Sequence, residues 1–304
     1  MPFLCVSVPL WLCFSMPAMK HPRAILVNGL LALLALVTVF PLVWMLCVSF
    51  MQPGEAASLP PPLLPQHPTL QHYEKLFGGA GIGRAFINSL LLALGTTLVS
   101  TTFNTLAGYA FARLRFRHRD RVFALLLAAL VIPGQVAMLP LFLMLKGLGL
   151  VNTWMGVLVP GMAGIFGIFL VRQYALNVPQ DLLEAARIDG AGEWRTFVSV
   201  VLPLLTPVLV TLALFAFLGS WNDFMWPLIM LTDGDLHTLP VALAALSREH
   251  VQDSEFMMAG AVITVLPVLL LFIALQRFYL QGLMLGGVKW GPPRTRFASP
   301  PRGA

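Results

Sequence analysis

One polar stretch in an otherwise apolar chain carries residue types suited to docking on another protein. It follows Pro179 and reads QDLLEAARIDGA from Gln180 to Ala191. The proline and the early acid Asp181 predict a helix from about Gln180, because proline suits a helix start and acids suit the helix dipole there. Gly190 and Gly192 then permit a sharp turn.

Each side chain in this stretch has a distinct possible use. Glu184 offers a carboxylate to a cation, and Ala185 with Ala186 forms a flat surface that can enter a cleft at low entropic cost. Gly190 permits close approach of a backbone, and Asp189 can cap the turn that follows. The same residues also fit a solvated amphipathic loop helix, and that alternative stays open.

A second group of residues could line a path for a polar solute. Trp221, Asn222 and Asp223 end an apolar run, where an aromatic face can stack on a sugar ring and amide or carboxylate groups can bind hydroxyls. Asn104 and Gln135 lie inside apolar segments, where polar side chains face a cavity or a neighbouring helix. An interfacial tryptophan belt and plain helix–helix hydrogen bonds remain the alternatives.

The chain lacks the sequence motifs of the common catalytic sites. It has no GxxxxGK[ST] phosphate-binding loop, no HExxH and no clustered His partners for a nucleophile. Cys5, Cys13 and Cys47 stand in apolar runs without a CxxC pair, so we expect neither a metal nor a redox site. The sequence therefore predicts a non-enzymatic protein that binds no cofactor itself.

The composition indicates that this chain folds in a membrane and not in water. Of 304 residues 58% are hydrophobic and 11% charged, and the mean hydropathy is +0.83. Soluble domains are nearer to about 25% charged, so a soluble fold is excluded, as are a disordered chain, a coiled coil and a disulfide scaffold. An all-α polytopic membrane protein remains. Six segments are long and apolar enough to cross a bilayer: residues 25–50, 86–112, 122–145, 154–171, 198–218 and 257–278.

The distribution of charge predicts the orientation of these spans. With six spans, 15 of the 19 Lys and Arg residues fall on the side that holds both termini, whereas eight of the 13 acids fall on the other side. The positive-inside rule then places both termini in the cytoplasm. Five arginines between 113 and 121 follow the second span directly, which favours contact with lipid headgroups over binding to nucleic acid.

The remaining segments divide the chain around this membrane domain. Residues 1–24 form an N-terminal segment, within which Met19 is the expected start of translation, with Met16 or a genuine extra segment as the alternatives. Residues 51–85 form a Pro-rich outer loop that we expect to be extended, and 279–304 a tail that ends in a Pro/Arg-rich, disordered stretch. The membrane domain proper covers 86–278 and includes the polar inner loop 179–197. The fragments WNDFMWPLI and TLPVALAAL in the last outer connection are expected to form short helices.

The polar inner loop resembles a family signature. Glu184-Ala185-Ala186, three residues, Gly190 and then Leu202-Pro203 match the EAA signature of permeases of ATP-binding cassette (ABC) importers. Further stretches resemble the carbohydrate branch of that family, in particular the smaller permease of maltose-type importers. They are Asn88-Ser89, Gly108 to Arg113, Phe217 to Phe224 with Trp226-Pro227-Leu228, Thr238-Leu239-Pro240, Gln276-Arg277 and Gly286 to Lys289.

The resemblance implies a fold, a function and a set of partners. The fold would be that of a type I ABC importer permease with six transmembrane helices, in a bacterial plasma (inner) membrane. Glu184, Ala185, Ala186, Asp189, Gly190 and Ala191 would form a coupling helix. The partners would be a second homologous permease, two ATP-binding subunits that hold ATP and Mg, and an extracytoplasmic solute-binding protein. The solute would be an oligosaccharide, polyol or glycerol phosphate.

Two other functions remain as alternatives. An ABC permease for a non-sugar solute would share the EAA stretch and differ in the WNDF and TLPV regions. A secondary transporter driven by an ion gradient would need ionisable residues within its spans, and these spans hold almost none.

Overall fold

The computed structural model describes residues 22–79, 81–249 and 253–287, and these residues are mostly helical with no β-strand. Three helices are long and apolar enough to cross a membrane over Ile25–Val48, Ile82–Arg113 and Ser254–Gln276. They lie in α1 (Pro22–Val48), α3 (Ile82–Arg113) and α14 (Ser254–Gly287). Three further candidate spans are long and apolar enough only if two helices joined by a bend are counted as one span. The described residues thus hold up to six candidate spans, the number predicted from hydropathy.

The bent pairs correspond to the spans predicted at 122–145, 154–171 and 198–218, for which the sequence predicted no bend. The pair α4 (Arg119–Ala129) and α5 (Gly134–Gly147) bends by 103°. The pair formed by α6 (Trp154–Leu158) with η1 (Val159–Gly161) and by α7 (Ile165–Leu176) bends by 41°. The last pair bends by 78°. It comprises α9 (Glu193–Thr196), η2 (Phe197–Val201) and α10 (Leu202–Leu204), then α11 (Thr206–Trp221).

Proline and glycine explain the breaks. Pro133 and Gly134 stand at the first break, Gly164 at the second, and Pro203 and Pro207 flank the third. Proline lacks the backbone N–H and its ring clashes with the preceding turn, so a helix bends or ends there. The π-helical turn η2 precedes the third break and loosens the same helix further.

The remaining helices are short and lie in the connections. They are α2 (Gln71–Gly78), α8 (Gln180–Ile188), α12 (Met225–Met230), η3 (Gly234–Leu236) and α13 (Leu239–Glu249). Helices α12 and α13 confirm the short helices expected from WNDFMWPLI and TLPVALAAL, and α8 confirms the helix expected from Gln180. The outer loop predicted at 51–85 is less extended than expected, because it contains α2 and the start of α3.

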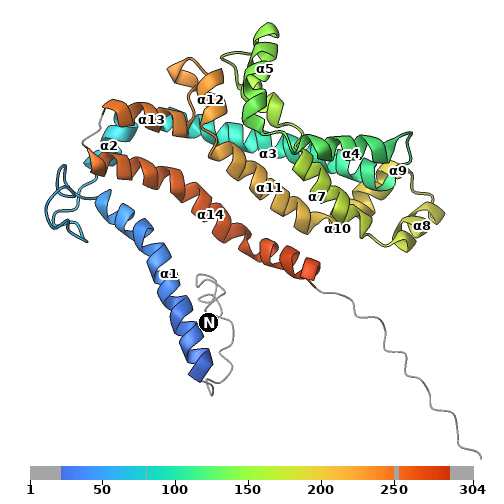
Figure 1. The fold of residues 1–304 in the computed structure, drawn as a ribbon, viewed down its shortest axis with the longest axis horizontal. Helices are drawn as coiled ribbons and strands as arrows, with labels where there is room; N and C mark the ends of the chain where they lie inside the picture. The colour runs from blue at the N-terminus through green and yellow to red at the C-terminus, as the bar shows by residue number, and fades with distance from the viewer. Residues whose placement is uncertain (1–21, 80, 250–252, 288–304) are drawn as a thin grey trace, which may run out of the picture. The chain divides into compact units, whose positions relative to one another are not determined.

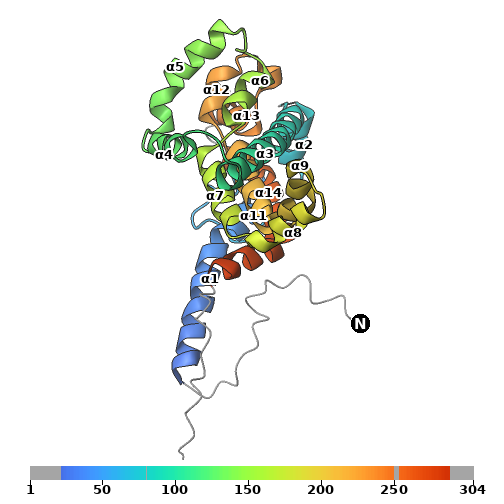
Figure 2. The ribbon, with the colours of Figure 1, turned by 90° about the vertical axis from the view of Figure 1, so that its right-hand side faces the viewer.

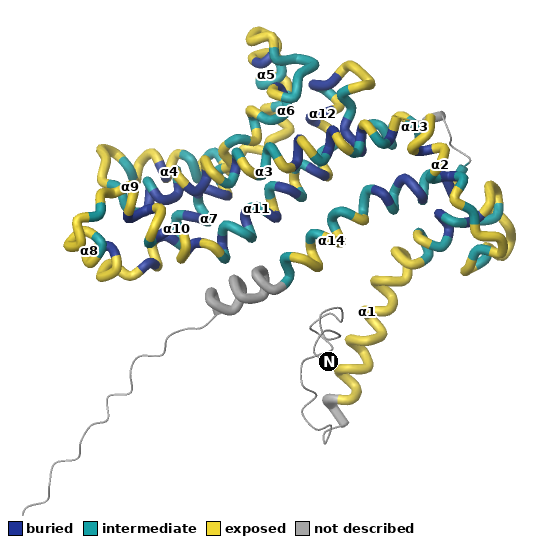
Figure 3. Tube along the Cα trace, turned by 180° about the vertical axis from the view of Figure 1, so that it is seen from behind, coloured by how far each residue is buried: buried dark blue, intermediate teal, exposed yellow. Residues whose placement is uncertain are grey.

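The predicted chain ends agree with the structure only in part. Helix α14 continues to Gly287, so the tail predicted from 279 begins inside a helix. The expected start at Met19 and the rest of that tail lie outside the described residues. Helix α1 is exposed along nearly its whole length, and only 6% of the residues in its most apolar stretch are buried (Figure 3).

The chain divides into two compact units, of which the smaller comprises Met1–Tyr73 and Gln252–Val262. Within its described part, hydrogen bonds from side chains order the loop after α1. The Glu55 carboxylate accepts from the backbone N–H of Gln66 (2.7 Å) and Gln52 (2.9 Å), and buried Glu255 accepts from Ala56 (2.8 Å). The hydrogen bonds from Gln66 and then Gln52 hold the pKa of Glu55 below its ordinary value of 4.5.

The larger unit, Glu74–Val251 and Ile263–Ala304, has its core where α3, α7 and α11 lie side by side (Figure 1, Figure 2). Helices α3 and α7 approach closely at two glycines. A Cβ on Gly108 would come within 2.7 Å of the Val171 side chain, and a Cβ on Gly167 within 2.4 Å of the Asn104 amide. Glycine at both positions therefore sets the distance between these helices.

The close approach predicts a large effect of a small side chain. Gly108→Ala should lower the free energy of unfolding by about 1–3 kcal/mol, because the added methyl group overpacks the α3–α7 contact. Thermal unfolding in detergent measures the change. Gly219→Ala in α11 is the matched control, because a Cβ there has no neighbour within 4 Å; equal melting temperatures for the two variants would contradict the packing assignment.

The Glu55 contacts predict a dependence of loop order on pH. Because the folded pKa is lowered, the carboxylate stabilises the loop above its ordinary pKa of 4.5, and this contribution is lost as pH falls through the lowered value. Hydrogen exchange at the Gln52 and Gln66 amides should therefore accelerate on acidification, relative to the intrinsic rates. Glu55→Gln should remove this dependence and exposed Glu74→Gln should retain it.

Candidate coupling site

The EAA segment, residues 179–197, is built around the short helix α8. Asp181 lies in its first turn and Arg187 in its last, so both charges complement the helix dipole. At its end the Ala191 N–H donates to the Ala186 carbonyl (2.9 Å) and the Gly190 N–H to the Arg187 carbonyl (3.0 Å). These two bonds form a Schellman motif, which requires a left-handed residue at Gly190.

Gly190 and Asp189 shape this turn through their backbones, and the left-handed Gly190 confirms the sharp turn predicted there. Gly190 has φ +79°, and a Cβ there would have no neighbour within 4 Å, so within this chain the glycine is needed for its conformation and not for close approach. Asp189 is the C-cap residue through its backbone, whose N–H donates to the Ala185 carbonyl (3.0 Å). Its side chain is exposed.

Helix α8 has one buried anchor and a broad exposed face. Leu183 is 2% exposed and joins a core cluster with Tyr109, Val178 and Phe197. Glu184 and Ala185 are exposed, whereas Ala186 and Ala191 are half-buried. Large apolar side chains are also exposed, since Ile188 is 86% and Trp194 68% accessible. The segment thus presents carboxylates, small residues and three exposed bulky apolar groups, of which Ile188 and Trp194 are the most accessible, and Leu183 anchors it to the core.

Charged side chains join the EAA segment to the end of α3. Arg113, the last residue of α3, donates to the carbonyls of Ala175 and Leu176 at the end of α7, to that of Val178 just after it, and to the Gln180 side chain. Arg187 pairs with Glu193 (2.8 Å), whose other carboxylate oxygen accepts from the Tyr109 hydroxyl (3.4 Å). Sequence reasoning counted Arg113 among cations that contact headgroups and missed this role, because its partners are backbone carbonyls 62–65 residues away.

The residues predicted for a solute path lie in different environments. Trp221 is fully buried; its indole N–H donates to the Thr264 carbonyl (3.0 Å), and its ring contacts those of Phe86 and Phe217. Asn222 is exposed and donates to the Leu218 carbonyl, and half-buried Asp223 accepts from the Trp226 N–H (3.3 Å). Trp221 therefore has the contacts of a packing residue.

The other two candidates do not join this group. Asn104 is 1% exposed; it accepts from the Gly164 N–H (2.9 Å) and donates to the Ser100 hydroxyl (3.0 Å), so it links α3 to the start of α7. Gln135 is exposed on the first turn of α5. No described hydrogen bond connects Asn104 or Gln135 to the residues after Trp221, and the solute-path assignment stays a prediction.

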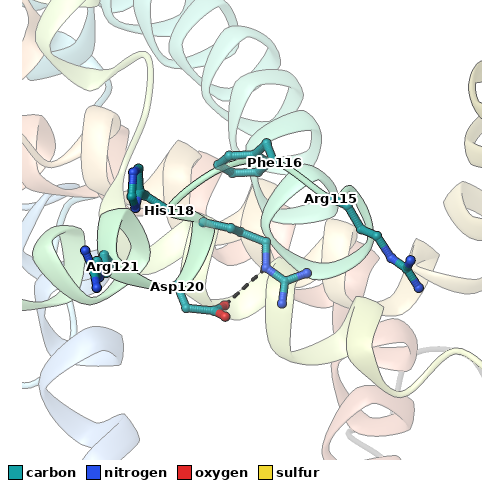
Figure 4. Close-up of a pocket in the computed structure, with 6 residues that line it drawn as sticks. Arg115, Phe116, His118, Asp120 and Arg121 are labelled. Atoms are coloured by element: carbon teal, nitrogen blue, oxygen red, sulfur yellow. Dashed lines mark hydrogen bonds and ion pairs between the residues drawn. The ribbon is translucent and has the colours of Figure 1, made fainter.

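The arginine-rich loop after α3 surrounds a shallow cavity of about 440 Å³ lined by Arg115, Phe116, His118, Arg119, Asp120 and Arg121. Figure 4 shows Arg115 and Arg121 on opposite sides of this loop, pointing away from each other. Asp120 pairs with Arg119 (3.1 Å). The cations therefore do not converge on one point, which fits a dispersed contact with a charged surface better than a pocket for one anion.

Comparisons with known proteins agree with this helical membrane architecture. The family model described as "Binding-protein-dependent transport system inner membrane component" matches residues 104–284. The permease AraQ of an arabinooligosaccharide transport system from Halalkalibacterium halodurans is 38% identical over 85% of this chain and 94% of its own length. GanQ, a galactooligosaccharide permease of Bacillus subtilis, is 32% identical over 90% and 99%. NgcG, a diacetylchitobiose permease of Streptomyces coelicolor, is 35% identical over 82% and 84%.

A solved structure shares the fold. A chain of a bacterial ABC transporter that imports the acidic polysaccharide alginate superposes with a TM-score of 0.76 at 21% identity, over 84% of this chain and 96% of that one. The fold and the EAA segment together define a multi-pass permease of the ABC importer class. The chain belongs to the family of binding-protein-dependent transport system inner membrane components.

The Schellman motif makes a prediction that is specific to one glycine. Gly190→Ala should cost about 1–2 kcal/mol locally, because an L-residue is disfavoured at φ +79°. Hydrogen exchange over residues 186–191 should accelerate accordingly. Gly192→Ala is the matched control, since Gly192 has φ −69° and open space around its Cβ position. Equal exchange in both variants would show that the motif does not stabilise the turn.

Proposed function

We propose that this chain is a permease subunit for a sugar or sugar derivative and that its EAA segment couples it to ATP-binding subunits. The solute class is an oligosaccharide, polyol or glycerol phosphate. Support for a sugar comes from relatives whose names specify arabinooligosaccharides, galactooligosaccharides and diacetylchitobiose. Support for the coupling role comes from the exposed Ile188 and Trp194 beside Glu184.

The exposed apolar pair is the observation on which the coupling role depends. Large apolar side chains gathered on a polar segment indicate a surface that another protein covers. Because α8 is anchored by Leu183 and closed by the Schellman motif, little conformational entropy is lost when a partner binds it. Glu184 adds a carboxylate that can pair with a cation at the edge of that interface.

In this proposal the chain forms half of a translocation pathway, with a second homologous permease as the other half. It is a multi-pass protein of a bacterial plasma (inner) membrane, with both termini and the EAA segment in the cytoplasm. Two ATP-binding subunits bind ATP and Mg, whereas this chain binds no cofactor and catalyses no reaction. An extracytoplasmic binding protein delivers the solute. Closure of the ATP-binding subunits then displaces α8 and switches the side on which the pathway is open.

Substitution on the exposed face tests the coupling role. Ile188→Glu should abolish copurification with the ATP-binding subunits, because it places a charge at the centre of an apolar interface. The folded permease should persist, since Ile188 is 86% accessible in this chain. Arg117→Glu is the control, as Arg117 is exposed outside the EAA segment.

Measurement combines affinity purification of the coexpressed subunits with uptake of a labelled panel of oligosaccharides, polyols and glycerol phosphate by membrane vesicles. Retained copurification and uptake in Ile188→Glu would refute the coupling role. Uptake of none of these solutes by the native importer, together with uptake of another class, would refute the sugar assignment alone.

A further inference from the structure

The EAA segment is held at both of its ends by the last turn of α3. At its start, the Arg113 guanidinium donates to the carbonyls of Ala175 (2.9 Å), Leu176 (3.2 Å) and Val178 and to the Gln180 side chain (3.1 Å). One planar, charged guanidinium thus donates to carbonyls at and just after the end of α7 and also reaches the first residue of α8.

The other end is held through one carboxylate. Glu193 accepts from the Tyr109 hydroxyl on α3 and from Arg187 in the last turn of α8. The Tyr109 ring also packs on Phe197, with ring centroids 4.7 Å apart. Arg113 and Tyr109 lie four positions apart and therefore on one face of α3. We call these two residues and their partners the α3 clamp.

The opposite end of α3 is fixed to another loop in the same unit. The Asn88 amide donates to the carbonyls of Asp235 (2.8 Å) and His237 (3.1 Å), and the Ser89 hydroxyl accepts from the Leu239 N–H (2.7 Å). Asn88 is 5% and Ser89 3% exposed, so water competes little for these bonds. Arg84 and Asp235 form an ion pair nearby.

Between these two attachments α3 is an unbroken helix. It comprises 32 residues without proline, which corresponds to a length of about 48 Å at 1.5 Å per residue. The spans formed by α4 with α5, by α6 with α7 and by α9 to α11 are all bent. Helix α3 therefore connects the EAA segment to the loop at residues 235–239 through one continuous helix.

We infer that Arg113 and Tyr109 are positioning residues that make α8, α3 and the segment 235–239 a single rigid arm. This inference rests on the proposed coupling role of α8. A displacement imposed on α8 should move residues 235–239 as well. Hydrogen bonds attach each of them to α3, and α3 is one continuous helix between these attachments. The partner that acts on α8 thereby moves the loop at the far end of α3.

A pair of spin labels tests whether the arm moves as one body. Cysteines replace Asp181, exposed in the first turn of α8, and Gly234, where a Cβ meets no neighbour, in a chain whose native cysteines are serine. Pulsed electron paramagnetic resonance measures the label distance in the importer assembled with its ATP-binding subunits, without nucleotide and trapped with ATP and orthovanadate. The mean distance should change by less than about 2 Å between the two states, the size of a small interface adjustment.

Variants of the clamp should uncouple the two ends. Arg113→Ala combined with Tyr109→Phe should broaden the distance distribution and lower solute uptake per ATP hydrolysed by about 3- to 30-fold. Arg113→Lys, which keeps the charge without the fork, should fall between this variant and the native chain. Arg117→Ala, four residues further along the chain, is the matched control for loss of an arginine, and it should leave both measurements unchanged.

The outcomes separate this inference from the proposed function. A native distance change of a helical turn (about 5 Å) or more would refute the rigid arm, as would clamp variants with a native distribution and native uptake per ATP. Retention of the ATP-binding subunits and of uptake in Ile188→Glu would instead count against the coupling role. If the double clamp variant fails to assemble, Tyr109→Phe alone, which removes one hydroxyl, decides the question by the same two measurements.

Discussion

The close contact between α3 and α7 is the constraint on which the EAA segment depends. Gly108 and Gly167 let the two helices approach closely. Val171 and Asn104 occupy the space that a Cβ at each of these glycines would need. At this separation the Arg113 side chain reaches the carbonyls at the end of α7, and Leu183 of α8 joins the core cluster. A wider spacing would remove the Arg113 hydrogen bonds to the end of α7 and leave Leu183 without its core contacts.

Bent and straight helices have different roles in this architecture. Three of the candidate spans break at glycine or proline, and a π-helical turn precedes the break between α10 and α11. Proline in a span removes a backbone hydrogen bond and makes the helix easy to reshape. The EAA segment therefore continues along the chain into a bent helix, whereas its side-chain contacts attach it to the straight helix α3. The covalent connection to the bent helix is therefore easier to deform than the side-chain connection to α3.

Hydropathy predicted which parts of the chain are helical spans, since every apolar segment of sufficient length corresponds to a helix or a bent pair. The helix at 180–188 and the turn at Gly190 also followed from local sequence, because proline, acids and glycine act through the backbone of their own turn. The bends were not predicted, although Pro133, Pro203 and Pro207 mark two of them. A hydropathy window averages over proline and does not respond to it.

The contacts of individual polar residues were the hardest to predict. Asn104 and Trp221 are predicted for a solute path, and each makes a hydrogen bond to a neighbouring helix that sequence alone did not locate. Arg113 looked like one of five similar cations, yet it alone of the five contacts the end of α7. A sequence shows the type of a polar side chain and its depth in a span, but its partner is chosen by helix rotation and spacing.

By itself, then, the sequence determined that this chain is a helical membrane protein with six candidate spans and that it carries the EAA stretch of an ABC importer permease. The length of an apolar segment and the residues that form a turn are local properties of the sequence, so both can be recognised without knowledge of the fold. The tertiary structure decided that α3 holds both ends of the EAA segment, through Arg113 at its start and Tyr109 near its end. These features depend on two glycine contacts between helices about 60 residues apart, a relation that exists only once the chain has packed.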